Sequence, residues 1–87
     1  MSIQNQVAII TGAGRGVGRA TAQLFAQKGA QVVLFSRTQA HLDETFASIT
    51  HMGGNALAIT GDVTQEEDVQ KLFQIARATY GRVDILI

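Results

Sequence analysis

The sequence predicts an α/β fold in which a parallel sheet lies between two layers of helices. Short runs of branched and other apolar residues alternate along the chain with segments whose apolar residues recur at helical spacing. The apolar runs show no alternation of apolar and polar residues, which is typical of strands buried on both faces. Strands that alternate with helices favour right-handed crossovers and a parallel sheet. The expected order is therefore β-α-β-α-β-α-β.

Four apolar runs are the expected strands, and they cover residues 7–10, 32–35, 56–59 and 83–87. Each of the three segments between them carries one apolar stripe that would face the sheet. The first expected stripe consists of Val17, Thr21, Leu24 and Phe25. The second consists of Leu42, Phe46 and Ile49, and the third of Val69, Leu72, Phe73 and Ala76.

Glycines and polar residues mark the expected helix ends. Lys28-Gly29 fits a C-terminal cation followed by a glycine, and Gly53-Gly54 and Gly81 close the second and third helices. The run from Thr64 to Glu67 predicts a capping box, with acidic residues at the positive end of the third helix.

The composition indicates one small folded domain over residues 1–87. Hydrophobic residues make up 46% of the chain and charged residues 16%, unlike a disordered chain. Formal net charge is zero, which disfavours a nucleic-acid partner. Without cysteine there is no disulfide or thiolate metal site, and no apolar run approaches the roughly twenty residues of a membrane helix. Residues 1–6 are polar and show no signal sequence, so we expect a cytoplasmic protein without a membrane partner.

A glycine-rich segment, residues 11–18, joins the first expected strand to the first expected helix. Glycine permits positive φ and close approach to an anion, and the N–H groups at a helix start point toward a phosphate. The segment lacks the glycine-lysine pair of a P-loop, and the usual G-x-G-x-x-G spacing fails. The alternative is that these glycines only form tight turns. The pattern that fits is T-G-x-x-x-G-x-G, at Thr11, Gly12, Gly16 and Gly18.

Over its whole length the chain resembles the short-chain dehydrogenases/reductases, NAD(P)-dependent enzymes built on a Rossmann fold. The resemblance rests on this loop, on Gly61-Asp62-Val63 after the third strand and on residues 81–87 at the fourth. Within this family, the sequence as a whole is most similar to the 3-oxoacyl-acyl-carrier-protein reductase type. The resemblance implies the N-terminal half of a three-layer αβα Rossmann-type sheet with strand order 3-2-1-4.

The resemblance also implies roles for single residues. Gly12, Gly16 and Gly18 would shape the loop, with Gly16 and Val17 where the pyrophosphate meets the helix. Thr11 would brace the loop rather than touch the cofactor. Asp62 matches the family residue that approaches the adenine ring, with Val63 beside it.

The end of the second strand favours NADP(H) over NAD(H). NAD-binding Rossmann proteins usually place an acid there, about 20 residues after the loop. This chain instead has Ser36-Arg37-Thr38, and the Arg37 fork suits the 2′-phosphate of NADP. Arg15 could reach the same phosphate, while solvated surface arginines are the alternative. Ser36 and Thr38 could add hydroxyl contacts, and Thr38 could equally be an N-cap. The candidate cofactor-binding residues are thus Gly12, Arg15, Gly16, Val17, Gly18, Ser36, Arg37, Thr38, Asp62 and Val63.

No catalytic or metal-binding constellation is expected. The resemblance implies that a Tyr-x-x-x-Lys pair, a serine and an Asn-Asn-Ala-Gly segment follow the fourth strand, and the sequence stops at Ile87. Tyr80 has Asp84 four places on and is expected to pack rather than react. His41 and His51 lack partners at metal spacing and are expected to face solvent.

The function expected is therefore the NADP(H)-binding half of an oxidoreductase that transfers hydride between nicotinamide and a carbonyl or alcohol, inactive by itself. The alternatives are a stand-alone nucleotide-binding module and a structural partner without catalysis. The fourth strand, residues 83–87, would be an apolar sheet edge, which favours a homo-oligomer or pairing through that edge.

Overall fold

The computed structural model describes residues 2–87 and contains one four-stranded sheet and three helices within them. The elements, in chain order, are β1 Val7–Thr11, α1 Gly16–Gln27, β2 Gln31–Ser36, α2 Gln39–His51, β3 Asn55–Thr60, α3 Glu66–Tyr80 and β4 Ile85–Leu86. The expected β-α-β-α-β-α-β order is confirmed. No helix in this described part of the chain is long and apolar enough to cross a membrane.

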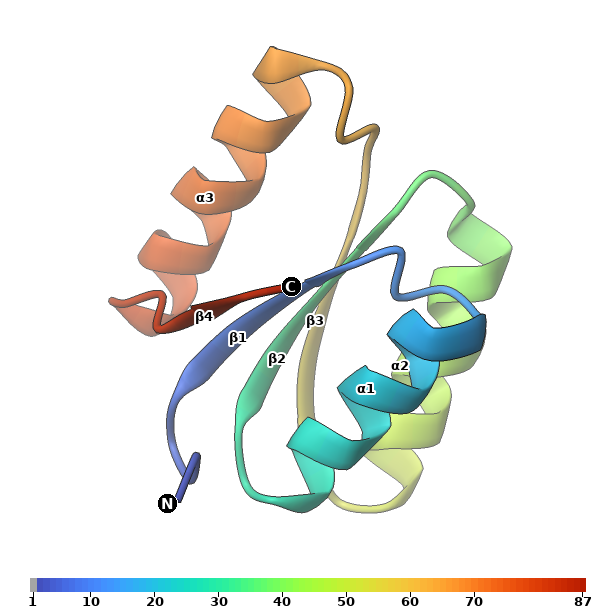
Figure 1. Cartoon of the computed structure of the whole chain (residues 1–87), viewed down its shortest axis with the longest axis vertical. Coiled ribbons are helices and arrows are strands. Elements are labelled where there is room, and N and C mark those ends of the chain that lie inside the picture. Colours follow the sequence, from blue (N-terminus) through green and yellow to red (C-terminus); the bar gives the residue numbers. More distant parts are fainter. Residues whose placement is uncertain (1) are drawn as a thin grey trace.

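All paired strands run parallel in the order β3-β2-β1-β4, as predicted (Figure 1). The register pairs Thr11 with Phe35, and Ser36 with Thr60. The carboxyl ends of β1, β2 and β3 therefore lie at one edge of the sheet. The segments that follow these three strands are brought together there.

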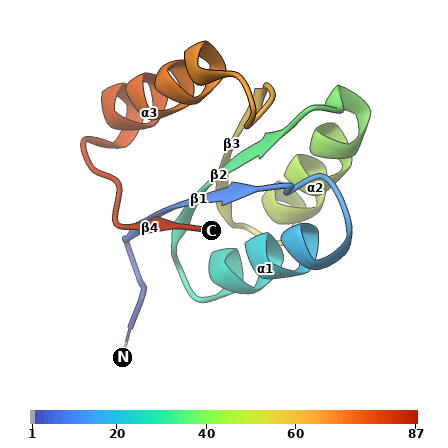
Figure 2. The ribbon, with the colours of Figure 1, turned by 45° about the horizontal axis from the view of Figure 1, so that its top comes forward.

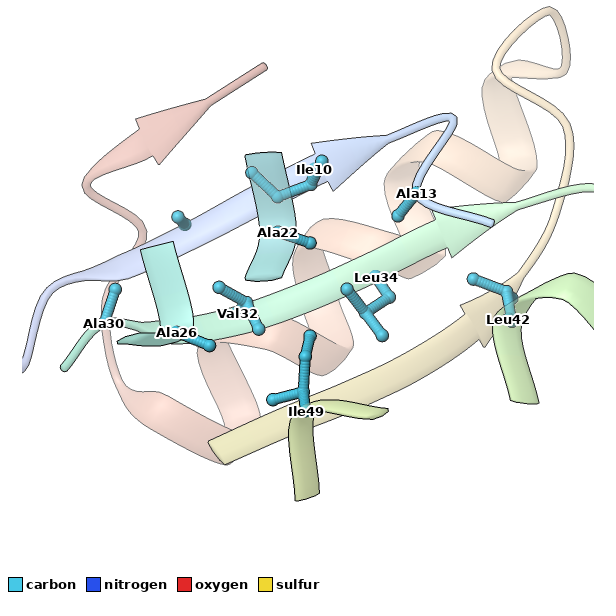
Figure 3. Packing of buried hydrophobic residues seen from close by; sticks show 10 residues of the cluster. Ile10, Ala13, Ala22, Ala26, Ala30, Val32, Leu34, Leu42 and Ile49 are labelled. Atoms are coloured by element: carbon cyan, nitrogen blue, oxygen red, sulfur yellow. The ribbon is translucent and has the colours of Figure 1, made fainter. Parts of the chain in front are cut away.

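Helices cover both faces of the sheet, α1 and α2 on one face and α3 on the other (Figures 1 and 2). The side chains of β1 alternate between the faces, because successive residues of a strand point to opposite sides. Ala8 and Ile10 belong to the core under α1 and α2, whereas Val7 and Ile9 belong to the core under α3. Figure 3 shows the first core, in which Ile49 of α2 lies among side chains of β2 and α1. The continuous apolar runs thus mark strands buried on both faces.

The predicted apolar stripe of α1 is wrong for Val17 and Leu24, whereas Phe25 packs against the core and Thr21 is half-buried. Val17 is 84% exposed and Leu24 49%, and the buried residues of the helix are Ala22 and Ala26. These alanines continue a row of small residues from Gly18 at a spacing of four, which lets the helix backbone approach the strands closely. The small side chains of Ala22 and Ala26 are therefore buried where the predicted stripe had placed Val17 and Leu24. The stripes of α2 and α3 are confirmed, with Leu42, Ile49, Leu72 and Ala76 fully buried or nearly so.

The predicted helix C-termini are confirmed, and one predicted N-terminus is wrong. Gly29, Gly53 and Gly81 follow the helices with φ of 89°, 87° and 81°. The capping box at Thr64 does not form, because α3 begins at Glu66 and Gln65 occupies the N-cap position. The Thr64 hydroxyl donates instead to Asp62 Oδ1, at 2.8 Å.

The strand β4 is shorter than the predicted residues 83–87. The carboxylate of Asp84 accepts the N–H of Val7, at 2.8 Å, so this strand donor is not available to a backbone carbonyl. The Asp84 N–H donates to the Val7 carbonyl, at 2.9 Å, and regular pairing with β1 starts one residue later, at Ile85. At the other end, the Thr11 hydroxyl and N–H both donate to the Ile87 carbonyl, each at 2.8 Å. Leu86, which is 58% exposed, lies on this open edge as the sequence indicated.

Candidate functional site

An open cavity of about 410 Å³ lies at the carboxyl edge of the sheet. Its walls come from the end of β2, from the segments after β1, β2 and β3 and from the first turn of α2. The lining residues are Gly12, Gly14, Arg15, Phe35, Ser36, Arg37, Thr38, His41, Gly61, Asp62, Val63 and Thr64. Most candidate residues are thus brought together, whereas Gly16, Val17 and Gly18 belong to the start of α1 and do not line the cavity.

The glycine loop turns sharply between β1 and α1. Gly12 and Gly16 both have φ of 61°, a conformation that residues with a Cβ rarely adopt. A Cβ on Gly18 would lie 2.0 Å from the Gly12 carbonyl oxygen. The third glycine of the motif therefore allows the helix to start directly against the loop, without itself reaching the cavity.

Gly14 is a site residue that the sequence pattern left unassigned. A Cβ at this position would lie 2.7 Å from His41 Cβ and 3.2 Å from Ser36 Oγ. Gly14 therefore lets the first turn of α2 pack directly on the loop. The T-G-x-x-x-G-x-G pattern treats position 14 as free, so only the packing of a distant segment reveals the constraint.

His41 is half-buried and lines the cavity. The expectation that this residue faces solvent is therefore wrong. The contact between α2 and Gly14 places it there. His51, at the other end of α2, is exposed as expected. Among residues 2–87, no three His, Cys, Asp or Glu side chains are grouped as a metal site would need.

The two arginines reach the cavity from different segments. Arg15 follows the turn after β1, Arg37 follows the end of β2, and both are exposed. Thr38 occupies the N-cap position of α2, but its side chain makes no capping hydrogen bond. Its N–H donates weakly to Ser36 Oγ, at 3.4 Å. The wall formed by residues 35–38 thus offers one guanidinium and two hydroxyls and no carboxylate.

The Asp62 carboxylate is held by its own turn. Its Oδ1 accepts the Thr64 N–H at 2.9 Å and the Thr64 hydroxyl at 2.8 Å. These bonds, helped by the charge of Arg37, hold the pKa of Asp62 below its usual value. The Asp62 N–H in turn donates to Asp68 Oδ2, at 2.9 Å. The carboxylate is therefore ionised and held in place. It lies on the part of the cavity wall that the segment after β3 forms.

Tyr80 lies outside the cavity and packs against the core under α3, as predicted. Burial raises the pKa of its hydroxyl. A tyrosine that serves as a general base needs the opposite shift. The geometry therefore assigns Tyr80 a packing role.

Comparison with known proteins identifies a family that the chain matches. The family described as short chain dehydrogenase matches residues 6–87. A short-chain dehydrogenase/reductase homolog of Bacillus subtilis is 41% identical over 88 residues, covering the whole chain and 81% of that relative. An uncharacterized oxidoreductase of Listeria monocytogenes is 44% identical over 86 residues, and the match covers 35% of it.

Solved structures share the fold closely. A hydroxysteroid dehydrogenase from Escherichia coli superposes with a TM-score of 0.95 at 36% identity. A short chain dehydrogenase/reductase from Burkholderia phymatum in complex with NAD gives 0.96 at 32% identity. These matches cover 98% and 99% of this chain but 36% and 31% of the solved chains. The chain thus spans about a third of the length of these structures.

Proposed function

The chain belongs to the short-chain dehydrogenase family, and we propose that its cavity binds NADP(H) in preference to NAD(H). Members of this family bind NAD(P), and the chain corresponds to their nucleotide-binding region. We further propose that it serves an oxidoreductase that moves hydride between nicotinamide and a carbonyl or alcohol carbon.

The observation that best supports a preference for NADP(H) is that two arginines line the same cavity. Arg37 and Arg15 both line it, and residues 35–38 contain no acid. A guanidinium binds a phosphate monoester through parallel hydrogen bonds, and a carboxylate at the strand end would repel it. The one carboxylate among the lining residues, Asp62, already accepts two hydrogen bonds from Thr64. The net charge facing a 2′-phosphate is therefore positive.

The glycine loop fits the diphosphate of the cofactor. Gly12 lines the cavity, and the space around a Cβ built on it is open to 4 Å. A side chain there would occupy volume on the cavity side that a close-lying anion needs. The loop leads into the N-terminus of α1, whose free N–H groups and dipole favour negative charge.

For catalysis we propose that these 87 residues bind the cofactor without turning it over. Tyr80 is the one tyrosine of the sequence, it packs outside the cavity, and burial raises the pKa of its hydroxyl. Asp84 rather than lysine stands four residues later. The residues that line the cavity include two arginines suited to an anion, and none of them is a tyrosine or a lysine. When bound, the cofactor would supply the hydride chemistry.

Calorimetric titration of the 87-residue chain with NADP+, NAD+ and 2′,5′-ADP tests the cofactor preference. We expect NADP+ and 2′,5′-ADP to bind more tightly than NAD+. Arg37→Ala should weaken NADP+ by roughly 10- to 100-fold, the worth of a charged hydrogen bond, and leave NAD+ nearly unchanged. Arg77→Ala, an exposed arginine of α3 outside the cavity, is the matched control and should change neither affinity. Equal losses for NADP+ and NAD+ in Arg37→Ala would show that the arginine does not read the 2′-phosphate.

A further inference from the structure

Arg19 of α1 and Thr45 of α2 meet at the glycine loop, although neither lines the cavity. The guanidinium of Arg19 donates to the Gly14 carbonyl from Nε, at 3.1 Å, and from Nη2, at 2.6 Å. Its Nε also lies 3.0 Å from Thr45 Oγ1, and its Nη2 pairs with Glu44 at 2.9 Å. One side chain of α1 therefore joins the loop to α2.

Thr45 is fully buried, and its hydroxyl has several partners. As an acceptor it receives the Arg19 Nε–H. As a donor it has one proton and three carbonyl oxygens in reach, those of Ala13 at 2.9 Å, His41 at 3.2 Å and Gly14 at 3.3 Å. The shortest of these contacts is to the loop. Arg19 and Thr45 thus bind two successive carbonyls of the glycine loop, and we call this pair the loop clamp.

The loop clamp determines the direction of two peptide planes. In a trans peptide the carbonyl and the N–H of the next residue point in opposite directions, and residues 2–87 contain no cis bond. Carbonyls of Ala13 and Gly14 that face the clamp therefore turn the N–H groups of Gly14 and Arg15 away from it. Both residues line the cavity, and within residues 2–87 neither N–H donates a hydrogen bond. Two unpaired donors at the mouth of a cavity suit an anion.

We propose that the loop clamp presets the glycine loop for the cofactor diphosphate, so that Arg19 and Thr45 are positioning residues for dinucleotide binding. This inference rests on the proposed nucleotide-binding function and extends it to two side chains that do not touch the ligand. The loop's donors are oriented before binding, so the ordering cost is not taken from the binding free energy. The Arg19–Glu44 contact is a partly exposed ion pair and contributes little by itself. The buried hydroxyl and the fork on Gly14 carry the effect.

The chain offers a matched control in a second link between the same two helices. Gln23 of α1 donates to Ser48 Oγ of α2, at 2.9 Å, without touching the loop. Thr45→Val removes the clamp hydroxyl at nearly constant shape, and Ser48→Ala removes the hydroxyl of the control link. We expect Thr45→Val to weaken NADP+ and NAD+ by the same factor, about 10-fold, because the diphosphate is common to both. Ser48→Ala should leave both affinities unchanged, and Thr45→Ser should restore them.

Equal binding by Thr45→Val and the wild-type chain would overturn the proposal. So would a loss confined to NADP+, since that would place Thr45 with Arg37 at the 2′-phosphate. Should Thr45→Val fail to fold, Arg19→Lys decides the matter. Lysine keeps the charge beside Glu44 but loses the planar fork on the Gly14 carbonyl, so a folded Arg19→Lys chain should show the same loss for both cofactors. Unchanged affinities there would overturn the proposal equally.

A measurement without ligand separates this inference from the proposed function. NMR order parameters of the Gly14 and Arg15 amides report the rigidity of the loop in the free chain. We expect them to fall in Thr45→Val and to stay at the wild-type level in Ser48→Ala. If wild-type chain binds no dinucleotide, the proposed function fails, and a fall in these order parameters would still support the clamp. Unchanged order parameters in Thr45→Val would refute the clamp whatever the chain binds.

Discussion

The helices α1 and α3 cover opposite faces of the same sheet by different means. On its sheet-facing side α1 presents Gly18, Ala22 and Ala26, which have almost no side chain. On the other face of the sheet, α3 buries Leu72 and Ala76. Half-buried aromatic rings such as Phe73 pack beside them. Phe25 of α1 also packs against its core, so the two helices differ in their fully buried residues, which are alanines in α1 and include a leucine in α3.

The difference follows from what each helix positions. The first turn of α1 forms the end of the glycine loop, and a Cβ on Gly18 would lie 2.0 Å from the carbonyl oxygen of Gly12. Close packing of α1 is thus a condition for the shape of the loop. The loop that precedes α3, residues 61–65, contributes to the cavity, but α3 itself does not. In its first turn α3 supports the site through Asp68, whose carboxylate accepts the Asp62 N–H. Large side chains such as Leu72 are tolerated farther along the helix, away from the cavity.

The largest effect should come from adding one methyl group to α1. In Gly18→Ala the new Cβ would lie 2.0 Å from the Gly12 carbonyl oxygen and 2.6 Å from its carbon, and both are backbone atoms. Neither can rotate away, so the loop or the helix must shift. We expect a loss of roughly 3 kcal/mol or more in the free energy of unfolding, at or beyond the upper range for overpacking. Urea unfolding followed by circular dichroism measures it.

Ala20→Ser, on the exposed side of the same helix, is the control and should change stability by about 0.5 kcal/mol or less. A Gly18→Ala chain as stable as the wild type would mean that α1 has room to move off the sheet. The contrast between the two helices would then disappear.

The next effect should come from removing volume on α3. Leu72 is 1% exposed, so Leu72→Ala should leave a cavity under α3 and cost about 2–4 kcal/mol. The same substitution on α1, Leu24→Ala, removes a half-exposed side chain and should cost less than about 1 kcal/mol. The pair also tests which stripe of α1 is the core. Equal costs for the two substitutions would restore Leu24 to the core, where the sequence pattern had placed it.

The element order and two of the three helix faces follow from the residue pattern, whereas the strand order was implied by the family resemblance. The order of elements follows because runs such as residues 32–35 are short and apolar throughout, which is typical of strands buried on both faces. The face of α1 does not follow, because apolar spacing ranks Val17 and Leu24 above alanine. Close approach of two backbones favours the reverse order, and it depends on the loop geometry around Gly12 and Gly18.

The site divides in the same manner. The glycine motif and the end of the second strand predicted Gly12, Arg15 and Arg37, the family resemblance implied Asp62, and all four line one cavity. Other contributions arise where α2 packs on the glycine loop, with segments some thirty residues apart in the chain. Gly14, His41, Arg19 and Thr45 meet there. Each residue is unremarkable in its local sequence, and only the tertiary contact gives it a role.

The smallest effect comes from the hydrogen bond between Asp84, which lies between α3 and β4, and Val7 of β1. Its contribution to the free energy of unfolding depends on pH. Hydrogen bonds from Arg82, and then from the Val7 N–H, hold the pKa of Asp84 below its usual value. A carboxylate whose pKa is lowered on folding stabilises the fold above its unfolded pKa, roughly 4, and loses this contribution as pH falls through the folded pKa. The wild-type chain should therefore lose stability below about pH 4.

Asp84→Asn should flatten this acid limb, because asparagine cannot ionise. The wild-type and variant urea midpoints should differ at pH 7 and converge as the pH approaches 2.5. Arg82→Ala should give an intermediate profile, since it removes the larger cause of the lowered pKa and keeps the 2.8 Å bond from Val7. Profiles that stay parallel over the whole range would show that Asp84 acts through shape alone. In that case the packing of the segment between α3 and β4 would determine that β4 starts at Ile85, and the charged hydrogen bond between Asp84 and β1 would not.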